Sequence, residues 1–309
     1  MRRKTLATVA TVLIACTAGG CGTAGENEPA KFSAAHREAL SVVSHEKLRD
    51  LTVAEEIEIE YAEHTLVKEC MEQKGFSYWL GPFIPAEARK AGGYVIDDVE
   101  WAKKYGYGRP FDEEGERNRR EHPNVRYPNG LSEEERIRYN IALDGQYDDV
   151  MKIPLPTGGA VETPREGCWV DARTALYGDL KTWLTARKTV TGLTPLYVPR
   201  IHKDSRLLKK VDAWARCMKK AGHPYSSPDE IRDKRVMLVK GMSARKAQET
   251  EVALAVTEAE CARATSLGET ARTLEKEYRG TLLKKYAKKY TTYRQMRLNA
   301  LARARGLDG

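Results

Sequence analysis

Cysteines offer the most chemistry in this chain of 309 residues, because a thiol can be acylated, can bind a metal or can form a disulfide. Two of the six, Cys16 and Cys21, follow a short apolar segment near the amino terminus. The other four lie far apart in the body of the chain and are Cys70, Cys168, Cys217 and Cys261. The sequence has no C-x-x-C motif and no histidine pair at zinc-ligand spacing, so neither a metal nor another cofactor is predicted.

The first 21 residues have the features of a signal peptide. Arg2, Arg3 and Lys4 form a positive start, and residues 5–15 (TLATVATVLIA) carry no charge. A helix of this length would extend about 16 Å, whereas a spanning helix needs about 20 apolar residues. Short apolar segments behind a positive start direct export. The sequence therefore predicts an exported protein with no second membrane segment.

The end of this signal resembles the lipobox of bacterial lipoproteins. In that family a branched apolar residue and two small or apolar residues precede a cysteine that receives a diacylglycerol and becomes the new first residue. Leu13-Ile14-Ala15-Cys16 matches this pattern, and Ala18-Gly19-Gly20-Cys21 matches it with alanine in place of leucine. The motif favours Cys16, whereas use of Cys21 leaves an even number of cysteines downstream. A plain secretory signal is the third interpretation.

The lipobox implies a location as well as a modification. A diacylglyceryl group would anchor the protein in membrane lipid, on the outer face of the cytoplasmic membrane. Residues 22–31 are mostly small or polar, and we expect a flexible tether over residues 22–32.

The cysteines of the body lie in a repeated motif. Residues 70–78 and residues 217–225 both read C-M-x-x-x-G-x-x-Y, which indicates an internal repeat. Exported proteins meet an oxidising environment that favours disulfides. Four cysteines allow three connectivities. One bridge per repeat is the simplest of them, and it predicts the pairs Cys70–Cys168 and Cys217–Cys261.

Helix signals dominate the body and predict an all-α fold of two helical repeats. We expect the first repeat over residues 33–190, a linker with Gly192, Pro195 and Pro199 over residues 191–203, and the second repeat over residues 204–309. Capping boxes predict helix starts at Ser132, Thr163 and Ser227. No strand is predicted, because runs with a period of two residues are absent apart from short apolar stretches.

Two segments differ from the rest of this pattern. Residues 76–131 are rich in glycine, proline and tyrosine and predict a long irregular insertion in the first repeat. One short helix is expected inside it, from a cap at Asp97 or Asp98 to Gly106. The chain ends in a long basic helix, expected from about Glu269 to Arg305.

These features occur in an order that resembles a group of uncharacterised exported lipoproteins of actinobacteria. The shared order is the lipobox, the tether, Cys70-Met71 with Gly75-Phe76, Tyr105-Gly106-Tyr107-Gly108, Ala142-Leu143-Asp144-Gly145 and Gly167-Cys168. The resemblance covers residues 50–190, and the second repeat is similar to part of it. It implies an envelope location and supports the cysteine pairing, but it implies no activity.

Signs of catalysis are weak in this sequence. There is no G-x-S-x-G, H-E-x-x-H, P-loop or G-x-G-x-x-G motif, and the six histidines are scattered. Asp97, Asp98 and Glu100 lie close to aromatic residues, and paired acids of this kind could cleave a wall glycan. The alternative is that they complement the dipole of a helix amino terminus. We therefore predict a non-enzymatic envelope lipoprotein that serves as a binding or structural module, with a wall glycan hydrolase as the alternative.

Aromatic side chains make the insertion a candidate binding surface for glycans or peptides. The residues predicted to form it are Trp79, Tyr94, Trp101, Tyr105 and Tyr107. The alternative is that a loop of this length needs aromatic residues to pack it down.

The terminal helix is the second candidate surface. Residues 271–309 contain eleven Lys or Arg and three Asp or Glu, an excess that equals the net charge of +8 of the whole chain. The residues predicted to bind are Lys284, Lys285, Lys288 and Lys289. Export makes nucleic acid an improbable partner, so we expect anionic wall polymers or lipid headgroups. The alternative is a solvated charged face, and no oligomeric state is predicted.

Overall fold

The structure is a computed structural model that describes residues 32–41, 44–90 and 93–307. The signal peptide, Cys16, Cys21 and the predicted tether up to residue 31 lie outside the described residues. The predicted all-α fold is confirmed, with one correction. A two-stranded antiparallel hairpin, β1 (Val150–Pro154) and β2 (Ala160–Pro164), joins the helices.

A first apolar core gathers elements from both ends of the chain. It contains α2 (Val53–Gln73), α8 (Cys168–Tyr177), α9 (Leu180–Thr191) and α15 (Ala287–Leu307), together with the hairpin. The helices α1 (Ala34–Ala39) and α7 (Glu133–Asp144) pack on α15 and α8, respectively. A capping box at Thr52 begins α2, and the predicted capping box at Ser132 begins α7.

A second apolar core consists of five successive helices. These are α10 (Thr194–Ile201), α11 (Ser205–Lys220), α12 (Pro228–Leu238), α13 (Ala244–Thr265) and α14 (Leu267–Lys285). Trp214 and Met218 of α11 are fully buried in it. The segment predicted as a linker carries α10, with Pro195 in its first turn, where proline is tolerated, and Pro199 inside the helix. Its packing against α14 supplies the stability that its sequence lacks.

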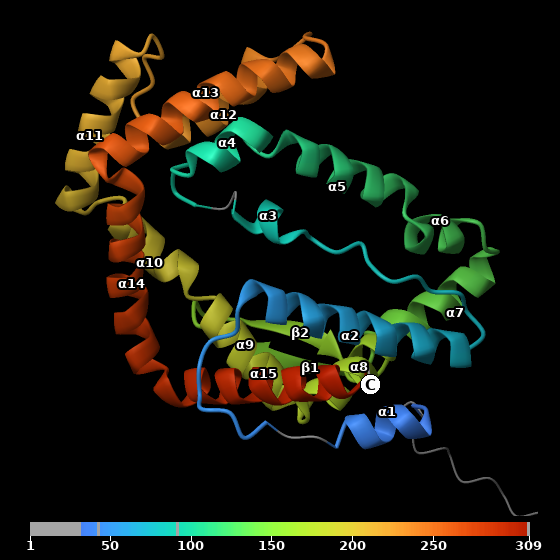
Figure 1. The fold of residues 1–309 in the computed structure, drawn as a ribbon. Coiled ribbons are helices and arrows are strands. Elements are labelled where there is room, and N and C mark those ends of the chain that lie inside the picture. Colours follow the sequence, from blue (N-terminus) through green and yellow to red (C-terminus); the bar gives the residue numbers. More distant parts are fainter. Residues whose placement is uncertain (1–31, 42–43, 91–92, 308–309) are drawn as a thin grey trace, which may run out of the picture.

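The insertion extends between the two cores (Figure 1). It holds α3 (Ala86–Arg89), α4 (Val99–Tyr105), α5 (Arg109–Glu121) and α6 (Pro123–Asn129). Only α4 was expected, and its cap at Asp98 and its end at Gly106 are as predicted. Helix α5 buries none of its residues, and Phe111 and Pro110 are its only apolar side chains, so its sequence holds too few apolar residues to predict it. Asp112 in its first turn and Arg119 in its last turn complement its dipole.

Both copies of the repeated motif form the same helix end. The N–H groups of Phe76 and His223 each donate to the carbonyl of a buried methionine, Met71 or Met218, at 2.9 Å. The glycine before each has a positive φ, as this type of helix end requires. The partner cysteines of the two motifs are placed differently, because Cys168 begins α8 whereas Cys261 lies near the end of α13.

Two helix predictions need correction. Thr163 does not begin a helix but pairs with Met151 in the hairpin, whose strand β1 buries Met151 and Ile153. The long basic helix is in two parts, α14 and α15, with a break at Tyr286. The break follows from packing, because Tyr286 contacts the second core whereas Tyr293 contacts the first. The chain therefore returns to its first core (Figure 1).

Candidate functional site

Two disulfides support the architecture. Cys70 pairs with Cys168, and Cys217 pairs with Cys261, so both predicted bridges are present. Cys70 and Cys168 are fully buried in the first core, and Cys261 is 2% exposed in the second, where Cys217 is half-buried. We infer a structural role for the first bridge in particular, because inaccessible sulfurs do not exchange readily.

The helix that carries Cys168 begins at a close contact between two glycines. A Cβ on Gly145, the last motif glycine before the hairpin, would lie 2.1 Å from the carbonyl oxygen of Glu166. A Cβ on Gly167 would lie 2.6 Å from the backbone nitrogen of Gly145. Both glycines have a positive φ. The Asp144-Gly145 and Gly167-Cys168 motifs thus fit together as one backbone junction beside the disulfide.

The Tyr-Gly-Tyr-Gly motif attaches the insertion to two buried glutamates of α13. The Tyr107 hydroxyl donates to Glu258 Oε2 at 2.6 Å, and the Ile96 N–H donates to Glu258 Oε1 at 3.3 Å. Arg109 Nε donates to Glu251 Oε2 at 2.8 Å. Glu258 is 1% exposed and Glu251 is 2% exposed. We call these contacts the latch, because they join the insertion to the second core.

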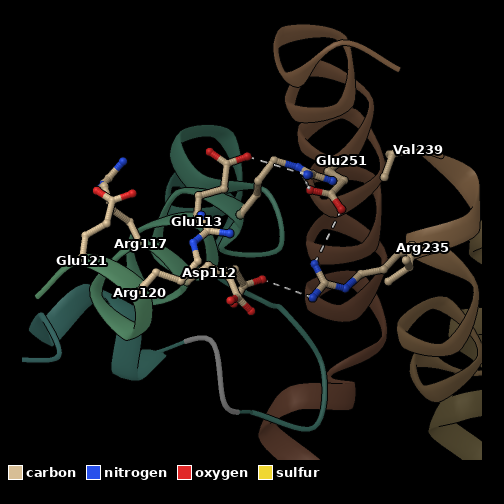
Figure 2. A pocket seen from close by; sticks show the side chains of 11 residues that line it. Asp112, Glu113, Arg117, Arg120, Glu121, Arg235, Val239 and Glu251 are labelled. Carbon is tan, nitrogen blue, oxygen red and sulfur yellow. Dashed lines mark hydrogen bonds and ion pairs between the residues drawn. The ribbon is translucent and has the colours of Figure 1, made fainter. Parts of the chain in front are cut away.

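A charged cavity of about 650 Å³ lies beside the latch, between α5, α12 and α13 (Figure 2). Arg235 of α12 bridges Asp112 at 3.5 Å and Glu251 at 3.6 Å. The side chains of α5 that Figure 2 labels in this cavity are Asp112, Glu113, Arg117, Arg120 and Glu121. The ion pairs of Arg235 with Asp112 and Glu251 join α5 to α12 and α13, so they add to the contacts of the latch.

The latch predicts a pH dependence of stability. Burial raises the pKa of Glu258 above its usual value of 4.5. The folded state then binds the proton of the Glu258 carboxyl more tightly than the unfolded state does. The resulting contribution to the free energy of unfolding is present below pH 4.5 and is lost as pH rises. We expect Glu258→Gln to abolish this pH-dependent fall in stability, because glutamine does not titrate. The free energy of unfolding of the wild type, minus that of the variant, should fall as pH rises from about 4 to 7. A difference that does not change with pH would contradict this assignment.

The insertion also borders a largely apolar pocket of about 670 Å³. One wall is the loop from Gly81 to Ala88, and the other is α5, which runs beside it (Figure 1). Phe83, Ile84 and Phe111 supply much of its apolar surface. Ile84 is 57% exposed, so its side chain is accessible at the edge of the pocket.

A second pocket of about 470 Å³ adjoins the first, and His64 and Ile84 line both. Three glutamates of α2 face four arginines there. Glu60 pairs with Arg89 at 2.6 Å, Glu63 with Arg173 at 2.6 Å, and Glu56 with Arg297 at 2.6 Å and Arg89 at 3.6 Å. Within the described ranges, the fourth arginine, Arg187, forms no ion pair. We call the two pockets together the cleft, with an apolar half and a charged half.

Aromatic rings complete the charged half. Trp183 stacks on Tyr177, with ring centroids 3.7 Å apart, and on Tyr293, with centroids 5.6 Å apart. Its buried indole N–H has no hydrogen-bond partner in the described part of the chain. This N–H is closed to solvent, whereas Arg187 is exposed, so the charged half offers one free cationic donor to an acceptor group. Burial lowers the pKa of His64 at the junction, which favours its neutral form.

The predicted aromatic residues fall into different environments. Tyr107 lines the apolar half of the cleft as well as the latch. Trp101 is buried, donates from Nε1 to the Glu87 carbonyl at 3.0 Å, and packs on Tyr105. Tyr94 contacts His202. Trp79 is 39% exposed, but its N–H and carbonyl are both held by the Asn124 side chain. The five residues therefore do not form one surface.

The three predicted acids also have separate contacts. Asp98 caps α4 by accepting from the Trp101 N–H at 3.0 Å. Asp97 contacts Gly268 in the first turn of α14 and pairs with Arg272 at 2.8 Å. Glu100 is exposed and pairs with Lys103. These contacts match the helix-dipole alternative, and the hydrolase remains a prediction.

Comparisons leave the function to be argued from the structure. No protein-family model, curated protein or solved structure matches this chain. The described part of the chain holds no group of three or more His, Cys, Asp or Glu that could bind a metal ion. Among the helices within the described ranges, none has the length and apolar content needed to cross a membrane.

Proposed function

We propose that this protein is a lipid-anchored envelope lipoprotein that binds a small amphipathic anion in its cleft. The lipobox and the resemblance to exported lipoproteins support the location. The ligand class follows from the junction at His64 and Ile84, where an apolar pocket adjoins a pocket whose Arg187 has no ion-pair partner within the described ranges. Apolar pockets with a few polar groups are the usual form of small-molecule sites.

The two halves suit two parts of one ligand. Phe83, Ile84 and Phe111 would cover an alkyl or aromatic body and remove it from water. A carboxylate or phosphate beyond Ile84 would accept hydrogen bonds from the exposed Arg187 guanidinium. The paired glutamates of α2 do not repel such a group strongly, because each is balanced by an arginine. Nothing in this scheme requires a catalytic residue.

Calorimetric titration with decanoate and decanol tests the proposal, since the two probes differ in charge but share an alkyl chain. We expect decanoate to bind more tightly than decanol. Arg187→Gln should weaken decanoate about tenfold and leave decanol unchanged, because it removes one charged hydrogen bond. Ile84→Asn should weaken both probes without lowering the melting temperature, since Ile84 is 57% exposed.

Two control variants match these changes outside the cleft. Lys181→Gln removes an exposed charge from the same helix as Arg187, and Leu208→Asn changes an exposed apolar residue of α11. Both should bind decanoate like the wild type. If neither probe binds, the cleft is not the ligand site. If decanoate and decanol bind equally, the charged half plays no part.

A further inference from the structure

The break between α14 and α15 gathers four lysines that the cleft does not use. We call Lys284, Lys285, Lys288 and Lys289 the basic elbow. Three of them are exposed and Lys289 is half-buried, and none forms an ion pair with any acid in the described ranges. Some other basic residues of the same two helices are neutralised, since Arg272 pairs with Asp97, Arg297 with Glu56 and Arg305 with Glu58. Lys276, Arg279, Arg294 and Arg303 of these helices also form no ion pair within the described ranges, and the elbow is where four such basic residues lie within six positions of the chain.

The elbow and the start of the described chain lie near opposite ends of α15. This helix has 21 residues, which corresponds to about 32 Å. At its carboxyl end, Gly306 contacts Ala39 of α1, and the preceding Phe32 is buried in the first core. Figure 1 shows α15 along one edge of the molecule, with α1 beside its carboxyl end. A tether from residue 32 would thus leave from the end of α15 that is far from the elbow.

We propose that the basic elbow binds anionic phospholipid headgroups of the membrane that holds the lipid anchor. This inference rests on the proposed anchoring, which places one end of α15 close to the membrane. The elbow then supplies a second contact at the other end, so α15 lies along the surface. Lysine side chains suit this role, because they act as flexible point charges that need no fixed partner geometry. A basic patch adds electrostatic attraction to an anionic membrane on top of the lipid anchor.

Sedimentation with vesicles tests the elbow separately from the anchor. The probe is the full mature chain with Cys16→Ser and Cys21→Ser, so that no lipid is attached. It should bind vesicles of phosphatidylcholine with one-third phosphatidylglycerol, but not vesicles of phosphatidylcholine alone. Half-molar salt should release it. Replacing all four elbow lysines by glutamine should weaken binding about a thousandfold, given the usual contribution of each basic residue near an anionic surface.

A charge-matched control separates the elbow from net charge. Replacing Lys203, Lys209, Lys219 and Lys220 by glutamine removes the same charge from exposed positions at α11. This variant should bind like the parent. The proposal is overturned if both variants lose binding equally or if the parent does not bind anionic vesicles. It is also overturned if the parent binds a soluble polyphosphate but not vesicles. If the cellular protein carries no lipid while the unlipidated chain still binds vesicles, the anchor fails and the elbow stands.

Discussion

Replacing Gly167 by alanine should lower the free energy of unfolding by about 3–5 kcal/mol, a large effect for one added methyl group. The new Cβ would lie 2.6 Å from the backbone nitrogen of Gly145 and 2.8 Å from the carbonyl carbon of Asp144. Backbone atoms cannot move aside as the end of a long side chain can. The residue would also hold a φ of +109°, which a side chain rarely adopts. The junction of α7 and α8 would have to open.

Gly158→Ala is the matched control for this substitution. Gly158 has a φ of +98°, but a Cβ there would meet nothing within 4 Å. Gly158→Ala should lower the free energy of unfolding only through the unfavourable positive φ, by about 1–2 kcal/mol. Guanidinium unfolding of both variants measures the difference. Equal costs would show that the close approach at Gly167 does not govern the stability of the junction.

Removing the bridge between Cys70 and Cys168 should lower the free energy of unfolding by about 4–5 kcal/mol, the limit that loop entropy sets. The bridge spans 98 residues, so its absence frees a very long loop in the unfolded state. This loop contains the whole insertion, α7 and the hairpin. We expect the double variant Cys70→Ala with Cys168→Ala to unfold at much lower denaturant concentration than the wild type.

The second bridge provides an internal comparison. Cys217 and Cys261 are separated by 44 residues, so the loop argument makes their bridge weaker by about 0.7 kcal/mol. Alanine at both positions should therefore destabilise the protein slightly less than loss of the first bridge. Guanidinium unfolding of the two double variants, followed by circular dichroism, gives the order. A stable protein without the first bridge would show that the core alone holds these elements.

Local chemistry made several helix ends predictable. Ser132, Asp98 and Gly106 each act through their own neighbouring backbone, so the sequence contains the whole signal. The same signal at Thr163 failed, because burial of Ile153 and its pairing with Val161 favour the hairpin over a helix. Helix α5 shows the opposite failure, since a helix with so few apolar residues gives little sign of itself in the sequence. Tertiary packing decided the first case.

The cleft could not be predicted for a related reason. His64, Ile84 and Arg187 come from α2, the insertion and α9, and no sequence spacing joins them. The aromatic content of the insertion did indicate a binding region, and Tyr107 and Phe111 line the cleft. Composition cannot show which rings become buried, as Trp101 does, and which remain accessible.

The anchored state in the envelope is the central claim of this account, because it would place both the cleft and the elbow at a membrane surface. Intact mass spectrometry of the membrane-extracted protein, before and after reduction, tests it most directly. We predict a chain that begins at Cys16, or else at Cys21, carries a diacylglyceryl group and gains four hydrogens when its two bridges are reduced. If Cys16 is the anchor, alkylation should also label Cys21 without reduction. A chain that keeps its first residues, or one cut elsewhere without added lipid, would contradict the account.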